Sequence, residues 1–542
     1  MPILKGRTAI VAFSDDSRFC NSVVSSLENK LFKCRMRRNN GPGLKSDCGT
    51  RHRFRKATKG NCMSYPEIIH HGAVDTVTGS CHQLLMNSSS SLLIDCGSVQ
   101  GREGRVESAS FDFDPESIRA LLVTHVHNDH VGRIPELLAA GYIGPILCSE
   151  PSAHMLPLVM EDTLKIAFAH DPAQAERHLE TINKRVIALP FDNWFSLIDH
   201  ESLHCKVRLQ RAGHILGSAY VECDLHYPLE GRSIRVVFSG DLGASHTPFL
   251  PAPKPPERAD ILVLESTYGD RLHEDRSTRQ QGLERIIDKA LEDNGTVLIP
   301  AFSIGRTQEL LYELEDILRR KMLLSQAGEG SARLDGDDIL PGDWSRLPVI
   351  LDSPLASRFT KLYQSFEDYW DNDARLRSGA GRKPLGFDQL IGIDTHEQHL
   401  RTVNYLASTA RPAIVIAGNG MCAGGRIVNY LKAMLGDRRH NVVFVGYQGK
   451  GTPGAAIQSH GPLGGYVELD RERFDIRAGI HTANGYSAHA DQAELVEFVT
   501  GMKEWPAQVR LVHGEASAKE ALGTVLSRKY ALQKHAVDLV IP

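Results

Sequence analysis

The sequence of 542 residues lacks any apolar run of the roughly 20 residues that a bilayer crossing needs. Its amino terminus has an apolar run of only about six residues before a polar stretch, which is too short for a secretory signal. The ten cysteines form no CxxC pair and do not reach the density of a disulfide scaffold. These absences exclude a membrane-spanning protein and a disulfide-rich secreted one, and they predict a reducing cytoplasm.

The main body of the chain also lacks an excess of basic residues. The whole chain carries a formal charge of −4, but residues 1–62 contain 14 Lys/Arg against 4 Asp/Glu, so residues 63–542 carry −14. A broad basic surface for nucleic acid is therefore absent from the body. A site for a polyanion there must be local, built from a few cationic side chains or from metal ions.

The basic segment 1–62 differs from the rest of the chain because its hydrophobic periodicity is weak. A disordered tail is the favoured interpretation, and a basic arm for nucleic acid is the alternative. A third interpretation places the natural start at Met63, since strand-like sequence follows directly.

The rest of the chain shows two patterns of predicted secondary structure. Residues from 64 onward are rich in short strands that end in Gly or Asp, with a helix expected over 151–185. From about 275, amphipathic helices alternate with continuous apolar strands such as TVLIPAF (296–302), the pattern of a parallel sheet covered on both faces. One such helix is expected over 306–323, and the polar stretch 324–346 is predicted to be a surface loop.

The strongest chemical signal is THVHNDHVGRIPEL (124–137), in which His125, His127, Asp129 and His130 follow a buried strand. Side chains two residues apart on extended backbone point the same way, so the first two histidines share one face. Imidazole and carboxylate ligands suit zinc, with manganese or iron as alternatives. Four donors within six residues can serve two neighbouring cations.

Further donors stand at the ends of other predicted strands: Asp95, His214, Asp241 and His513. Each of them alone has a structural explanation, because a single polar residue at a strand end is common. Together with the HxHxDH cluster they indicate a dinuclear metal site.

These motifs, in this order, resemble the metallo-β-lactamase superfamily. Three further stretches resemble motifs A, B and C of its β-CASP nucleases, the branch of ribonuclease J and of the endonuclease of pre-mRNA 3′-end cleavage: ESTYGDR (265–271), GYSAHAD (485–491) and LVHGE (511–515). The resemblance covers about residues 65–542. It implies an α/β fold, in which an αββα sandwich (64–269 and 486–542) contains an inserted β-CASP domain (270–485) with a parallel sheet flanked by helices.

The resemblance also implies roles for individual residues. His125, His127 and His214 would hold one zinc ion, Asp129, His130 and His513 the other, and Asp241 would bridge the two. Asp95 would support the ligand loop by hydrogen bonding.

Two adjacent cations lower the pKa of a shared water, so that hydroxide can attack phosphorus at neutral pH. The expected products are a 5′-phosphate and a 3′-hydroxyl. His489 is the candidate general acid for the 3′-oxygen, and Glu265 would orient it and keep it protonated.

Single-stranded RNA is the expected substrate, because RNA-processing members of the resembled family keep the histidine of motif C, here His513. A DNA nuclease of the same family and a non-catalytic scaffold are the alternatives. Endonuclease or 5′-exonuclease action and a homodimer stay open.

Gly-rich loops after three predicted strands offer Ser303, Arg306 and Lys450 to an RNA phosphate. Tight turns that pack helix against sheet explain these loops equally well. The loop in AIVIAGNGMCAGGRIVNYL (413–431) lacks the spacing of a dinucleotide-binding fingerprint, so nucleotide binding is disfavoured.

Overall fold

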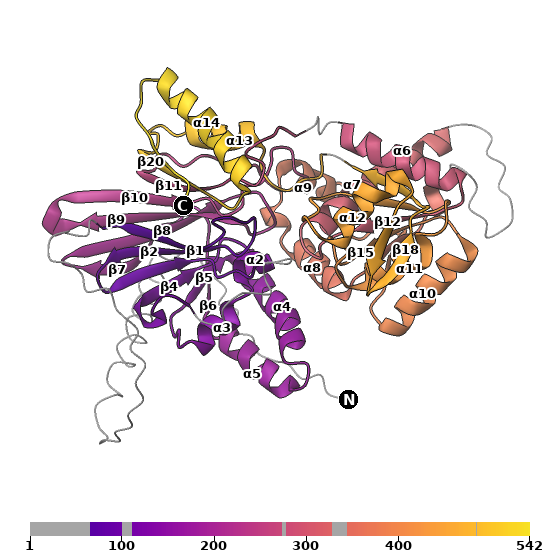
Figure 1. Ribbon diagram of the computed structural model, residues 1–542, viewed down its shortest axis with the longest axis horizontal. Helices are drawn as coiled ribbons and strands as arrows, with labels where there is room; N and C mark the ends of the chain where they lie inside the picture. The colour runs from indigo at the N-terminus through magenta and orange to yellow at the C-terminus, as the bar shows by residue number, and fades with distance from the viewer. Residues whose placement is uncertain (1–64, 100–110, 274–277, 328–343, 484) are drawn as a thin grey trace.

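The computed structural model describes residues 65–99, 111–273, 278–327, 344–483 and 485–542. The basic segment 1–62 and most of the predicted loop 324–346 lie outside these residues. Figure 1 shows two lobes side by side, and the yellow carboxy-terminal segment packs on the lobe that holds the indigo amino-terminal strands. The first lobe is therefore assembled from both ends of the described chain.

Two sheets form the first lobe, and each is ordered as follows. The first contains β1 (Glu67–Gly72), β2 (Cys81–Asn87), β3 (Ser90–Ile94), β4 (Ile118–Leu122), β5 (Ile146–Ser149) and β6 (Val186–Leu189). The second contains β21 (Asp538–Val540), β20 (Gln508–Val512), β11 (Ile261–Glu265), β10 (Arg232–Phe238), β9 (Ala219–Tyr227), β8 (Leu203–Arg211) and β7 (Phe195–His200).

Alternating side chains of these strands pack on opposite faces. In β3, Leu92 and Ile94 join the core between the two sheets, whereas Leu93 joins the core under the helices on the other side. In β11, Val263 lies in the core between the sheets, whereas Leu262 packs under the carboxy-terminal helices. The period of two thus buries both faces of each sheet and gives four layers, helix–sheet–sheet–helix.

The helices of this lobe are α2 (Asn128–Val131), α3 (Ile134–Ala139), α4 (Glu150–Ala167), α5 (Pro172–Asn183), α13 (Gln492–Thr500) and α14 (Ala516–Leu532). The expectation of one helix over 151–185 was wrong, because α4 ends at Ala167 and a separate helix, α5, begins at Pro172. Asp171 accepts a hydrogen bond from the backbone N–H of Gln174, and Pro172 occupies the first helical position. Both features start a new helix rather than continue an old one.

The second lobe is built on a parallel sheet, with strand order β14 (Leu390–Gly392), β13 (Val349–Asp352), β15 (Ala413–Ala417), β12 (Thr296–Pro300), β16 (Asn441–Phe444) and β19 (Gly479–Thr482). A hairpin of β17 (Tyr466–Leu469) and β18 (Glu472–Asp475) lies beside it. Its helices are α6 (Arg279–Glu292), α7 (Arg306–Ala327), α8 (Pro354–Ser365), α9 (Asn372–Gly379), α10 (His396–Thr409), α11 (Arg426–Met434) and α12 (Pro453–His460).

Helices cover both faces of this parallel sheet. Val297 and Ile299 of β12 share a core with Leu311 of α7, whereas Leu298 between them shares a core with Leu431 of α11. The predicted fold class, a sandwich interrupted by a three-layer domain, is confirmed. Helix α7 continues to Ala327, four residues into the stretch predicted as a loop.

Sheet membership changes between β11 and β12 and again between β19 and β20. The predicted domain boundaries at 269/270 and 485/486 fall inside these two intervals. In the described part of the chain, helices that combine the length and hydrophobicity of a membrane span are absent.

Buried His440 gives the second lobe a pH-dependent stability. Its Nδ1 accepts a hydrogen bond from the backbone N–H of Thr296 at 3.1 Å, and burial lowers the pKa of this ring below the ordinary 6.5. A histidine with a lowered folded-state pKa contributes stability that is complete above about pH 6.5 and is lost as the pH falls below it.

We therefore expect His440→Asn, whose amide oxygen can accept the same hydrogen bond without titrating, to flatten the pH dependence. Between about pH 7.5 and about pH 5.5 the melting temperature should fall by less in the variant than in the parent protein. Calorimetric scans at both pH values measure this difference. Equal losses in the two proteins would contradict the role given to His440.

Candidate metal centre

The functional side chains lie where strands of both sheets end. Residues 125–130 follow β4, and Asp241 and His513 follow β10 and β20, which flank β11 in parallel register. Parallel pairing aligns the carboxyl ends of these strands, so residues far apart in sequence meet at one edge. His214 joins them from the loop between β8 and β9.

Left-handed backbone directs four of these loops. Asp95 has φ 59° and His513 has φ 53°, and the residues before His214 and Asp241 are glycines with φ 73° and 52°. A residue with left-handed backbone at a strand end turns the chain sharply. Residues other than glycine rarely adopt that backbone conformation unless tertiary contacts support it. A Cβ on Gly240 would lie 2.7 Å from Thr124 Cβ, so only glycine fits there.

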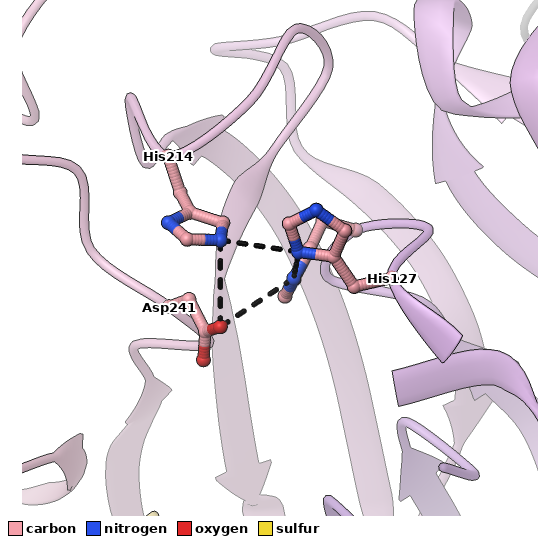
Figure 2. A group of neighbouring side chains, drawn as sticks. His127, His214 and Asp241 are labelled. Carbon is pink, nitrogen blue, oxygen red and sulfur yellow. Dashed lines mark hydrogen bonds and ion pairs between the residues drawn. The ribbon is translucent and has the colours of Figure 1, made fainter. Parts of the chain in front are cut away.

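The first group of candidate ligands consists of His125, His127, His214 and Asp241. Three of these side chains converge in Figure 2. His127 Nδ1 lies 3.1 Å from His214 Nε2 and 3.0 Å from His125 Nε2. One carboxylate oxygen, Oδ2 of Asp241, lies 3.5 Å from His125 Nε2 and 3.6 Å from His214 Nε2. The four ligand atoms lie within 4.8 Å of one another and surround one point.

The second group uses the other oxygen of the same carboxylate. Oδ1 of Asp241 lies 3.3 Å from His130 Nε2 and 3.7 Å from His513 Nδ1. Asp129 Oδ2 completes the group, 3.7 Å from His513 Nε2 and 4.0 Å from His130 Nε2. The seven side chains nominated from the sequence are thus brought together, with Asp241 between two groups.

Buried ligand atoms without hydrogen bonds test whether this donor set fits a metal. Three such atoms in the described residues are His130 Nε2, Asp241 Oδ1 and His513 Nε2. A buried polar atom without a partner costs about 1–3 kcal/mol, so a protein keeps several together only where something else binds them. Imidazole and carboxylate donors at these positions fit a divalent cation.

The protonation states of His125, His127 and His214 agree with metal binding. Burial lowers the pKa of His127 to about 4, and it lowers the pKa values of His125 and His214 well below the ordinary value. These rings are neutral at pH 7 and keep a lone pair for a cation. Burial would also lower the pKa of His130, but the charges of Asp241 and Asp95 raise it well above 6.5. Such concentrated negative charge favours a cation.

Asp95 holds the ligand loop from behind. Its Oδ1 accepts a hydrogen bond from the backbone N–H of Thr124 at 2.8 Å, and its Oδ2 accepts one from the Thr124 hydroxyl at 2.8 Å. The same Oδ2 lies 2.7 Å from His130 Nδ1. Nδ1 of His130 therefore donates to Asp95, which leaves Nε2 directed at Asp241.

His489 stands beside the first group, paired with Glu265. Its Nδ1 lies 3.1 Å from Glu265 Oε2, and its Nε2 lies 3.9 Å from Asp241 Oδ2. Burial would lower the pKa of this ring, but the charges of Glu265 and Asp241 outweigh it and raise the pKa to about 9. His489 is protonated at pH 7, with Nδ1–H donated to Glu265 and Nε2–H facing the centre.

Glu265 is fixed in its turn. The carboxylate is 1% exposed, and its Oε1 accepts a hydrogen bond from the backbone N–H of Leu242 at 2.6 Å. Leu242 directly follows Asp241, so one carboxylate links the position of His489 to that of the shared ligand.

The hydroxyls that support the ligands were not predicted from the sequence. Besides Thr124, the Thr267 hydroxyl lies 3.3 Å from His513 Nδ1, and the Ser80 hydroxyl donates to Asp95 Oδ2 at 3.3 Å. Thr124 and Thr267 lie within the motifs at 124–137 and 265–271. That position was the only signal, because hydroxyl residues are common at strand ends.

The three residues offered to an RNA phosphate differ in accessibility. Lys450 is exposed and Ser303 is half-buried, its hydroxyl 3.2 Å from that of Ser353. Arg306 is only 9% exposed and forms a buried ion pair with Glu309. A buried and paired guanidinium is poorly placed to receive a substrate.

Family models match over residues 78–301 (Metallo-beta-lactamase superfamily), 307–457 (Beta-Casp domain) and 473–538 (Zn-dependent metallo-hydrolase RNA specificity domain). The chain is 36% identical over 461 residues to "Ribonuclease TTHA0252" of Thermus thermophilus, which covers 85% of this chain and 96% of that protein.

The chain belongs to the β-CASP family of the metallo-β-lactamase superfamily. It is 28% identical over 483 residues to "Transcription termination factor FttA" of Methanosarcina mazei, covering 86% of this chain and 69% of that protein. The resemblance inferred from the motifs is confirmed. As a member of this family the chain is a metal-dependent hydrolase, and its His/Asp clusters are the place for divalent cations.

The support given by Asp95 can be measured through metal affinity. In Asp95→Asn an amide N–H₂ must face Thr124 or His130, so the orientation of the His130 ring is lost. We expect affinity for Zn²⁺ to fall by about 10–100-fold, measured by competition with a chromophoric chelator. Glu222→Gln is the matched control, because Glu222 is equally buried but pairs with Arg208, at 2.9 Å. Unchanged affinity in Asp95→Asn would refute the role.

Proposed function

We propose that this β-CASP hydrolase is a dinuclear-zinc phosphodiesterase that cleaves single-stranded RNA to give a 5′-phosphate and a 3′-hydroxyl. His125, His127 and His214 would hold one zinc ion, Asp129, His130 and His513 the second, and Asp241 would bridge them. Zinc is preferred only on the basis of ligand type, so manganese is the alternative metal.

One observation carries this proposal: the two oxygens of Asp241 face different groups of histidines. Oδ2 faces His125 and His214, whereas Oδ1 faces His130 and His513. A carboxylate divided in this way supports two cations rather than one. When bound, two divalent cations supply a hydroxide nucleophile near neutral pH and neutralise charge on the phosphate.

His489 and Glu265 would complete the reaction. The 3′-oxygen leaves poorly as an alkoxide, so an acid must give it a proton. Protonated His489 presents Nε2–H on the side of the centre near Asp241, while Glu265 holds Nδ1–H and fixes the plane of the ring. His489 would thus donate the proton, and Glu265 would keep the ring charged and oriented.

RNA is favoured by the name of the Thermus relative, a ribonuclease, by the match to an RNA specificity domain and by the presence of His513 in motif C. A cytoplasmic location and a homodimer stay predictions. The described cysteines are all buried free thiols, which suits a reducing compartment.

The proposed function predicts selective cleavage of RNA. Purified protein reconstituted with zinc or manganese should cut a 5′-labelled single-stranded RNA and leave the matching DNA and the β-lactam nitrocefin intact. Asp241→Asn should abolish cleavage and bind less metal, measured by mass spectrometry of the metal content. A ladder of products would indicate internal cuts, and immediate mononucleotide would indicate 5′-exonuclease action. Equal cleavage of DNA would favour a DNA nuclease, and a protein without metal or activity would favour a scaffold.

The role of His489 predicts a loss that depends on the leaving group. His489→Ala should keep both metals and slow cleavage by about 10²–10⁴-fold, since the 3′-oxygen then leaves unprotonated. An RNA with a 3′-bridging sulfur has a leaving group that needs no proton, so the variant should cleave it nearly as fast as the parent. Asp241→Asn, the control, should fail on both substrates. An equal loss on both substrates in His489→Ala would exclude His489 as the acid.

A further inference from the structure

Two aromatic side chains are exposed at the carboxyl edge of the parallel sheet. Phe302, in the loop after β12, is 37% exposed, and Tyr447, in the loop after β16, is 39% exposed. Strands β12 and β16 are paired in parallel, so both loops leave the same edge of the sheet. Aromatic residues of the surrounding cores are almost completely buried, for example Phe444 at 0%. Exposure at these two positions therefore needs an explanation.

Both loops lie against loops that carry metal ligands. Gly305 follows Phe302 by three residues, and a Cβ at Gly305 would lie 2.6 Å from Cγ2 of Ile215, the neighbour of His214. The Tyr447 hydroxyl donates to Glu515 Oε1 at 3.4 Å, and Glu515 follows His513 by two residues. One aromatic loop thus borders the first ligand group and the other borders the second.

The Phe302 ring is held in place while part of it stays open. A Cβ on Gly420 would lie 3.0 Å from two ring carbons of Phe302, so this ring rests on bare backbone. The carbonyl of Gly420 accepts a hydrogen bond from Gln448 Nε2 at 3.0 Å, which ties this loop to the one that carries Tyr447. Within the described ranges neither ring stacks on another aromatic side chain.

We propose that Phe302 and Tyr447 each stack on one base of the single-stranded RNA on its way to the metal centre. The inference rests on the proposed function and names a contact for the substrate bases. Stacking suits this protein because residues 63–542 carry a net charge of −14, and contact with the face of a base does not require positive charge on the protein. Every base offers an aromatic face, so the contact accepts any sequence.

The test uses single abasic nucleotides. In Phe302→Ala and Tyr447→Ala we expect kcat/KM on intact RNA to fall about tenfold each. A series of RNAs, each abasic at one successive position, should contain one position per ring where the parent protein loses about the same factor. On that RNA the corresponding Ala variant should show no further loss, because the base that it would have held is already missing.

Conservative and matched variants separate stacking from loop structure. Phe302→Tyr should regain most of the activity that Phe302→Ala loses, whereas Phe302→Leu, apolar but without a π face, should not. Tyr405→Ala is the matched control: Tyr405 is 48% exposed on α10 of the same lobe, and its removal should leave cleavage unchanged.

Two outcomes would overturn the inference, and both are distinct from failure of the proposed function. If the Ala variants lose the same factor on every abasic RNA as on intact RNA, the rings only support their loops. If they lose nothing on intact RNA, the bases do not meet these rings. Failure of the parent protein to cleave or bind RNA at all would instead refute the ribonuclease proposal, and the inference with it.

Discussion

A single buried carboxylate, that of Asp241, organises this molecule. Four imidazole nitrogens lie 3.3–3.7 Å from its two oxygens, in surroundings that exclude water from the Asp241 side chain. So many lone pairs crowded into a desolvated space are costly unless cations share them. The ligand side chains would not adopt this arrangement on their own. They are held in it by the left-handed turns, the glycines and the supporting hydroxyls. Folding thus bears the free-energy cost of burying unpaired polar atoms, and a bound cation would offset that cost.

The site lies across the ends of two sheets rather than within one. Asp95 and the HxHxDH segment follow strands of the first sheet. Asp241 and His513 follow β10 and β20 of the second sheet, and Glu265 is the last residue of β11 between them. Each ligand group takes members from both sheets, so relative movement of the two sheets would pull the members of each group apart. Leu92 and Val236 are fully buried in the core between the sheets, and this core therefore fixes the positions of the metal ligands relative to one another.

Much of this arrangement could be predicted from the sequence because it follows from local rules. Continuous apolar strands that alternate with amphipathic helices predicted the parallel sheet, and strand-end donors predicted the ligands. The interruption between α4 and α5 was not predicted, because the start signal of α5, Asp171 followed by Pro172, lies inside a long helical pattern. Local patterns also did not reveal that Arg306 turns inward to Glu309, since an arginine beside a Gly-rich loop looks the same whether it is paired or free. Contacts across the fold, such as that of Thr267 with His513, have no local signature at all.

The pairing of β11 with β20 joins residues almost 250 positions apart, and His513 follows the second of these strands. Every residue of the inserted lobe is synthesised between them. On the ribosome, the second ligand group lacks His513 until the whole inserted lobe has been synthesised. A nascent chain can therefore complete its centre only after the inserted lobe has left the ribosome, so folding of that lobe precedes assembly of the centre.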